Sequence, residues 1–131
     1  MREAIEEAMR EAMKEQAPGA PSFIELGVPA GHRARRFYGD VLGWTFTDMG
    51  EDNFLARTPT IQIGLHARDP DAVFVVYFLV DDLEAAVARV RAAGGKADEP
   101  GPEQEGFGRF AECRDDQGVR FGLRQVPGEA G

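Results

Sequence analysis

Few side chains of this sequence have types suited to proton transfer or metal binding: two histidines, one cysteine and a set of carboxylates. Glu25 lies in a strand-like run and could act as a general base if burial raised its pKa. A carboxylate in a strand more often pairs with an arginine, and Arg120 and Arg124 are suitable partners. His66 could be a proton shuttle or a displaced metal ligand, but its polar neighbours also suit a solvated surface histidine. Both alternatives stay open for each residue.

The remaining candidate side chains show no sign of activation. Cys113 follows Glu112 in a strand-like run, and nothing nearby makes it look like an activated thiol, so a buried structural cysteine is the favoured interpretation. His32 lies in a polar turn before a helix and is expected at the surface. A metal site assembled from Glu25, Gln62 and His66 is an alternative, because all three could face one cavity.

The elements that must position these side chains occur twice along the chain. The matching pairs are Val28 with Val80, Gly43 with Gly95, and Ile63-Gly64-Leu65 with Phe121-Gly122-Leu123. Recurrence at a nearly constant offset indicates two copies of one supersecondary unit. We therefore predict one domain over residues 21–125, with module one at 21–67 and module two at 72–125.

The first copy reads as a strand, a helix and further strands. Residues 22–28 alternate with a period of two, which indicates a strand. Apolar residues then recur at helical spacing from 34 to 42, and Gly43 follows at the position of a C-terminal cap. Short strands are expected over 44–66, the last with Gln62, Gly64 and His66 on one face.

The second copy repeats this order. A strand is expected at 73–80, a helix from Asp81, and strands up to Arg124. The spacing of Asp81 and Glu84 predicts a capping box at the helix start.

Residues 1–20 and 126–131 fall outside the repeat. Ile5, Met9 and Met13 lie at helical spacing, which predicts an extra N-terminal helix followed by a Pro- and Gly-containing linker that ends at residue 20. A frayed, partly helical tail is the alternative, because like charges stack along the opposite side. Residues 126–131 are expected to be a loose tail.

Composition restricts the classes of partner. The chain has 131 residues and a formal net charge of −8, which argues against nucleic acid or an anionic membrane as a partner. A single cysteine excludes an intramolecular disulfide, and the acidic N-terminus does not read as a signal peptide, so we expect a cytoplasmic protein. The longest apolar run, 72–80, is too short to span a bilayer.

Four segments carry a resemblance to a known family. They are Phe37-Tyr38-Gly39-Asp40-Val41-Leu42-Gly43-Trp44, Val80-Asp81-Asp82-Leu83, Ala92-Ala93-Gly94-Gly95, and the run from Asp115 to Leu123. In order and spacing they resemble the vicinal oxygen chelate superfamily of glyoxalase I, extradiol dioxygenases, fosfomycin-resistance enzymes and bleomycin-resistance proteins. The resemblance implies an α+β fold of two tandem βαβββ modules, whose mixed sheet curls into a cup that holds a metal or a ligand. It also implies a homodimer.

The same resemblance indicates where metal ligands stand in metal-bearing members, on the first and last strands of each module. Those places correspond to Phe23 and Gly64 in module one, and to Val75 and Gly122 in module two. None of these side chains offers an oxygen, imidazole or thiolate donor. We therefore expect no metal and no cofactor, and neither a metal-dependent glyoxalase nor a metal-dependent dioxygenase. The metal-free binders of the family, such as the bleomycin-resistance proteins, are the closer analogue.

Strand alternation then fills the predicted cup with a mixture of apolar and polar groups. The expected ligand-binding residues are Phe23, Glu25, Gln62, Gly64, His66, Val75, Tyr77, Arg120 and Gly122. The two glycines are expected to keep space open, or to relieve crowding where the sheet bends. The favoured function is metal-independent binding of a small, partly apolar or aromatic molecule.

Two other functions compete with binding. One is a lyase, isomerase or other enzyme of the same fold that uses Glu25, His66 or Tyr77 for proton transfer. The other is a structural dimer whose cup is filled by its own side chains.

Overall fold

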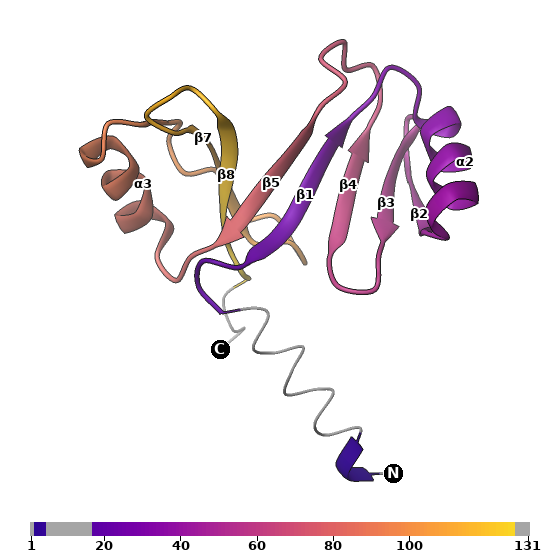
Figure 1. Cartoon of the computed structure of the whole chain (residues 1–131), viewed down its shortest axis with the longest axis horizontal. Coiled ribbons are helices and arrows are strands. Elements are labelled where there is room, and N and C mark those ends of the chain that lie inside the picture. Colours follow the sequence, from indigo (N-terminus) through magenta and orange to yellow (C-terminus); the bar gives the residue numbers. More distant parts are fainter. Residues whose placement is uncertain (1, 5–16, 128–131) are drawn as a thin grey trace. The chain divides into compact units, whose positions relative to one another are not determined.

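The computed structural model describes residues 2–4 and 17–127, which form two compact units (Figure 1). The N-terminal unit is Phe23–Val76, and the C-terminal unit runs from Tyr77 onward together with the described residues before Phe23. The predicted N-terminal helix lies almost wholly outside the described residues, as does most of the tail predicted at 126–131. Within the described part of the chain, no helix combines the length and the apolar character of a membrane span.

The N-terminal unit contains a helix and a small sheet. Its elements are β1 (Pro21–Gly27, in this unit from Phe23), α2 (Gly31–Leu42), β2 (Thr45–Gly50), β3 (Asn53–Arg57) and β4 (Gln62–His66). The strands lie in the order β2-β3-β4-β1, with β1 and β4 parallel and the other neighbours antiparallel. One face of β1 and β4 carries Leu26, Ile63 and Leu65, which are buried in a core with Ala34 of α2. Because side chains alternate along a strand, the residues between these core positions on β1 and β4 point to the opposite face.

Both ends of α2 are fixed by identifiable groups. Gly43 adopts the left-handed conformation at φ 72° and donates its N–H to the Gly39 carbonyl, which confirms the predicted C-terminal cap. At the other end, the Asp52 carboxylate accepts the backbone N–H groups of Gly31 and His32 at 2.7 and 2.8 Å. Partial burial raises the pKa of Asp52, but these hydrogen bonds outweigh it and leave the pKa below its ordinary value.

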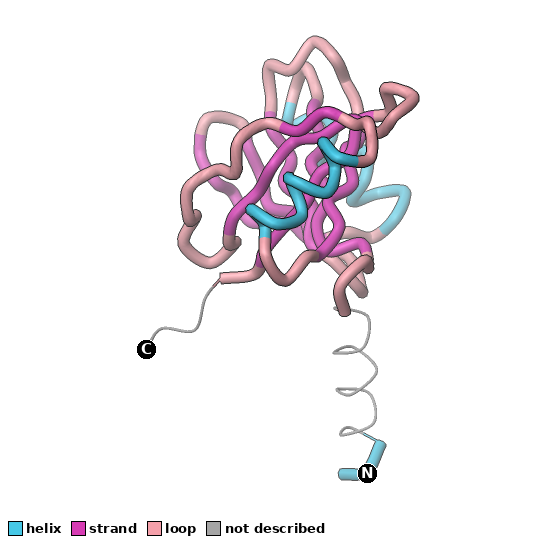
Figure 2. Tube along the Cα trace, turned by 90° about the vertical axis from the view of Figure 1, so that its left-hand side faces the viewer, coloured by secondary structure: helices cyan, strands magenta, loops and turns pink. Residues whose placement is uncertain are grey.

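The C-terminal unit repeats the same order of elements. They are β5 (Phe74–Leu79, in this unit from Tyr77), α3 (Leu83–Ala92), β6 (Lys96–Ala97), β7 (Arg109–Arg114) and β8 (Arg120–Gln125). The strands lie in the order β5-β8-β7-β6, with β5 and β8 parallel. A core of Leu83, Ala86, Val87, Ala111, Cys113 and Leu123 joins α3 to β7 and β8. In Figure 2 the helices are cyan, the strands magenta and the loops pink.

The predicted α+β fold with two βαβββ modules is therefore confirmed, and one boundary needs correction. The N-cap of α3 is Asp82, whose side chain accepts the Ala85 N–H at 3.1 Å, and not Asp81. Glu84 forms no capping box with Asp81, because its carboxylate pairs with Arg109 of β7 at 2.7 Å. The sequence pattern predicts this start one residue too early, because two adjacent aspartates offer the same capping group.

Candidate functional site

Five of the predicted site residues share one face of the parallel β1–β4 pair. The register pairs Phe23 with Gln62, Glu25 with Gly64, and Gly27 with His66. Side chains alternate between faces along a strand, so these residues point away from the core that contains Ile63 and Leu65. The structure thus brings Phe23, Glu25, Gln62, Gly64 and His66 together within one unit, as the alternation predicts.

His66 lies between two carboxylates. Its Nε2 atom is 3.2 Å from Oε2 of Glu25, and its Nδ1 atom is 3.7 Å from Oδ2 of Asp69. The side chains of Glu25, His66 and Asp69 are 33%, 45% and 22% exposed, so the group is open to a ligand without being fully solvated. An imidazole with a carboxylate at each nitrogen can exchange protons with a bound molecule.

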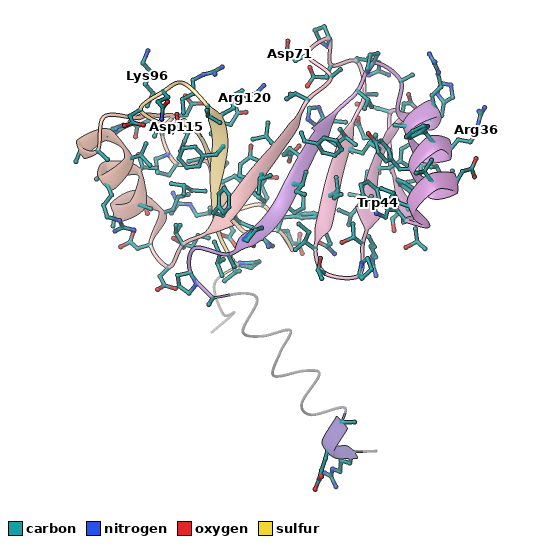
Figure 3. All side chains as sticks on the ribbon, viewed as in Figure 1. Arg36, Trp44, Asp71, Lys96, Asp115 and Arg120 are labelled. Atoms are coloured by element: carbon teal, nitrogen blue, oxygen red, sulfur yellow. The ribbon has the colours of Figure 1, made fainter. Side chains whose placement is uncertain are left out.

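Asp69 is a functional candidate that the sequence did not reveal. It lies in the loop after β4, and Figure 3 labels Asp71 in this loop. Its Oδ1 atom accepts the Asp71 N–H at 2.9 Å, and its own N–H donates to the Val28 carbonyl at 3.0 Å. A Cβ atom at Gly27 would lie 2.6 Å from Cγ of Asp69, so only glycine at 27 leaves room for this carboxylate. No pattern in the sequence links Gly27 to Asp69.

The C-terminal unit carries the equivalent face on β5 and β8. Tyr77 pairs with Gly122 across the two strands, and Tyr77 packs edge-on against Phe110 with ring centroids 5.3 Å apart. Arg120 contacts the Glu112 carboxylate at 2.9 Å. The face therefore combines an aromatic pair with an exposed ion pair.

Arg124 extends this face and is held by several acceptors. Its Nε atom donates to the Phe107 carbonyl at 2.8 Å and its Nη1 atom to Oγ of Ser22 at 2.9 Å, and burial lowers the pKa of the guanidinium. The guanidinium carbon also lies 5.9 Å from the centre of the Phe110 ring. These contacts tie β8 to the loop before β7 and to the start of β1.

The expectation that two glycines keep space open is wrong in this structure. A Cβ atom at Gly64 would lie 3.0 Å from Cζ of Phe23, and a Cβ atom at Gly122 would lie 2.6 Å from Cγ of Tyr77. An aromatic ring from the same unit thus covers each glycine. Rings commonly fill the gap that a strand glycine leaves, because the glycine exposes backbone that a flat side chain can cover.

The structure also places three further candidate residues: Val75, Cys113 and His32. Val75 is buried. Cys113 is buried in the α3 core, and burial raises the pKa of its thiol to about 11, which confirms the structural interpretation. His32 is exposed at the start of α2, as predicted, with Nδ1 3.4 Å from Asp52.

The donor set offers little to a metal ion. The four places at which metal-bearing relatives would carry ligands hold Phe23, Gly64, Val75 and Gly122, and none has a donor atom. Among the described residues, no three side chains of the His, Cys, Asp and Glu types are grouped so that they could hold a metal.

Two grooves lie outside the predicted site. One, of about 550 Å³, runs along α2 in the N-terminal unit and is lined by Arg33, Arg36, Phe37 and Tyr38 among others. Arg36 points away from the sheet (Figure 3). The other, of about 600 Å³, lies beside α3 in the C-terminal unit and includes Phe78 and Phe121 in its wall. No residue of the predicted ligand-binding set lines either groove, so sequence periodicity gave no signal for them.

Comparison with known proteins places this geometry in a family context. Residues 21–123 match the model of the Glyoxalase/Bleomycin resistance protein/Dioxygenase superfamily. The anthracycline biosynthesis proteins DnrV of Streptomyces peucetius and DauV of Streptomyces sp. (strain C5) are each 30% identical, over 82% of this chain and 47% of the relative. The chain thus spans about half the length of these curated relatives.

Solved structures show the same fold at low sequence identity. Methylmalonyl-CoA epimerase from Mycobacterium tuberculosis superposes with a TM-score of 0.63 at 21% identity, covering 85% of this chain and 89% of the epimerase. Homoprotocatechuate 2,3-dioxygenase from B. fuscum superposes with a TM-score of 0.63 at 18% identity, covering 85% of this chain and 33% of the dioxygenase. At these identities the likeness shows the fold alone.

Proposed function

We propose that this chain, which belongs to the Glyoxalase/Bleomycin resistance protein/Dioxygenase superfamily, binds a small, partly aromatic molecule without a metal ion. The observation that carries this proposal is the content of the four family ligand places: two apolar side chains and two glycines, with no donor atom among them. The polar groups needed to orient a ligand stand beside these places, at Glu25, Gln62 and His66.

The names of the curated relatives suggest a first ligand to test. DnrV and DauV are named for anthracycline biosynthesis, so an anthracycline or one of its precursors is the class we favour. The ring of Phe23 is only 3% exposed and packs over Gly64, so the accessible groups of this face are the partly exposed side chains of Glu25 and His66, which suit the polar groups of such a molecule.

Thermal unfolding with a panel of anthracyclines and bleomycin tests this proposal. A ligand at one hundred times its dissociation constant stabilises the folded chain by about 2.7 kcal/mol if it does not bind the unfolded chain. Phe23→Ala and Gln62→Ala should weaken that stabilisation, whereas His32→Gln, on the exposed start of α2, should not. Loss of the stabilisation in EDTA, or one tightly held metal ion per chain by elemental analysis, contradicts the metal-free proposal. The absence of any ligand in the panel favours the structural alternative.

We also propose that the protein is a homodimer. Phe37, Val41 and Leu42 on α2 are 58%, 60% and 55% exposed, although they continue the apolar spacing that predicted this helix. Their exposure leaves an apolar surface that association with a second copy would bury.

A further inference from the structure

The exposed surface of α2 combines apolar and basic side chains. Phe37 and Val41 are 58% and 60% exposed, and the helical spacing places Arg33 and Arg36 on one flank of this pair. We propose that the α2 surface, which consists of these four residues, binds the acidic N-terminal segment of a second copy of the chain, residues 1–16. The inference rests on the homodimer proposed above and names the segment of the second copy that covers α2.

The α2 surface borders a groove that can admit side chains. The groove has a volume of about 550 Å³ and is lined by Arg33, Arg36 and Phe37, and also by Asp40. Arg36 points away from the sheet (Figure 3). No hydrogen bond or ion pair joins either arginine to the part of the chain that the structure describes. The groove therefore offers aromatic surface and a positive charge that a partner can neutralise.

The N-terminal segment supplies matching apolar side chains. Residues 1 and 5–16 lie outside the described residues, but their sequence has a regular pattern. Ile5, Met9 and Met13 recur at every fourth position, so they share one face of a helix. This face is about 12 Å long, as is the α2 surface, because each spans eight steps of about 1.5 Å. The two methionines can adapt to an uneven groove wall.

The charges of the segment and of the α2 surface are opposite. Glu7, Glu11 and Glu15 recur at every fourth position along one flank of the apolar face. Like charges at this spacing destabilise an isolated helix, and Arg33 and Arg36 would neutralise them. The formal net charge of the chain is −8, so attraction of an acidic segment requires a locally basic surface such as this one.

The groove beside α3 is less suitable for the segment. Its wall includes Pro18, which is close to the segment in the sequence. However, Asp81 and Asp82 also line this groove, against the single positive charge of Arg89. The two carboxylates would repel an acidic segment. Charge therefore favours α2 over the groove that contains Pro18.

A two-fold dimer allows both copies to bury their α2 surfaces. Each copy would give one segment and receive one, so the two contacts are identical. The segment leads into Gly19, whose N–H donates to the Leu79 carbonyl at 2.8 Å. Gly19 belongs to the C-terminal unit, whereas α2 belongs to the N-terminal unit. Exchange between copies thus brings the C-terminal unit of one chain to the N-terminal unit of its partner.

Crosslinking between cysteine variants of the whole 131-residue chain tests this contact. A preparation that carries Met9→Cys is mixed with one that carries Val41→Cys, and the mixture is treated with a flexible bifunctional maleimide. The native Cys113 is buried and does not compete for the reagent. We expect a covalent product of two chains. The matched control replaces Val41→Cys by Ala88→Cys, at an exposed position of α3, and should give much less of this product.

A chain that carries both Met9→Cys and Val41→Cys identifies the donor of the segment. A covalent product of two chains supports exchange between copies. A crosslink within a single chain shows that the segment binds α2 of its own copy, and this result overturns the exchange.

Charge reversal gives an independent readout, with folding of each variant checked by thermal unfolding. Arg33→Glu with Arg36→Glu should raise the dissociation constant of the dimer about tenfold, because like charges across an interface oppose association. Glu11→Arg with Glu15→Arg should have the same effect, and a chain with all four substitutions should recover the parent constant. Arg89→Glu on α3 is the matched control and should leave the constant unchanged. Equal weakening by Arg89→Glu, or no recovery with four substitutions, overturns the pairing.

The results also separate this inference from the homodimer on which it rests. A dimer by sedimentation that gives no crosslink between positions 9 and 41 overturns the role of the segment and leaves the homodimer standing. A monomer at micromolar concentration overturns both proposals, whereas ligand binding is measured separately and does not depend on either.

Discussion

Gly122→Ala is the substitution whose cost the structure defines best. The new Cβ atom would lie 2.6 Å from Cγ of Tyr77, well inside the 3.4–4 Å of ordinary contact. Tyr77 is only 5% exposed and packs edge-on against Phe110, so its ring has little room to move. Overpacking of this kind costs about 1–3 kcal/mol. For a chain of this length, about 2 kcal/mol lowers the melting temperature by roughly 6–10 °C.

A graded series makes the assay specific to this contact. Gly64→Ala should cost less, because its Cβ atom would lie 3.0 Å from the far end of the Phe23 ring and 3.4 Å from Oε1 of Glu25, which are longer contacts than those at Gly122. Gly39→Ala is the control, because Gly39 lies inside α2 and its new Cβ atom would be 3.6 Å from the Phe46 ring, an ordinary contact distance. Alanine at this position should stabilise the helix by about 0.5–1 kcal/mol. Thermal and urea unfolding would rank the three variants.

A double-mutant cycle isolates the ring as the cause. Tyr77→Leu removes the aromatic edge, so Gly122→Ala should cost about 1 kcal/mol less in the Tyr77→Leu background than in the parent. The reasoning fails if Gly122→Ala is as stable as the parent, or if the two substitutions are additive. Either result would mean that Tyr77 does not fill the space above Gly122.

Three further predictions follow from named contacts. Because the pKa of Asp52 lies below its ordinary value of 3.8, the stability that it contributes is present above that pH and is lost as the pH falls below it. Asp52→Asn should therefore flatten the acid limb of a stability–pH curve, and an unchanged limb would contradict this. With the pKa of its thiol at about 11, Cys113 should react with a thiol reagent at pH 8 only after unfolding; rapid reaction of the native protein would refute its burial. Sedimentation should give about twice the chain mass at micromolar concentration, and Phe37→Asp with Val41→Asp should yield monomers; if the dimer persists, the interface lies elsewhere.

Local pattern was sufficient for the fold. The alternation in β1 and β4 reflects a period of two that each strand carries by itself, so it placed Glu25, Gln62 and His66 on one face. The internal repeat then fixed the order of elements, and Gly43 marked the end of α2 through a backbone conformation that glycine adopts without strain. These features depend on residues close in the sequence, and the sequence therefore determined them.

Tertiary structure alone decided the contacts of the candidate site. Asp69 reaches His66 because its loop turns back over Gly27, with Arg68 in a left-handed conformation at φ 59°. Asp52 reaches the start of α2 across 21 residues of sequence. A strand glycine can leave open space or be covered by an aromatic ring. Which of the two occurs depends on the side chain that the neighbouring strand places beside the glycine, and here Phe23 and Tyr77 cover the two glycines. Such contacts join residues that are far apart in the sequence, and no periodic pattern connects them. They depend on packing and hydrogen bonding that exist only in the folded chain.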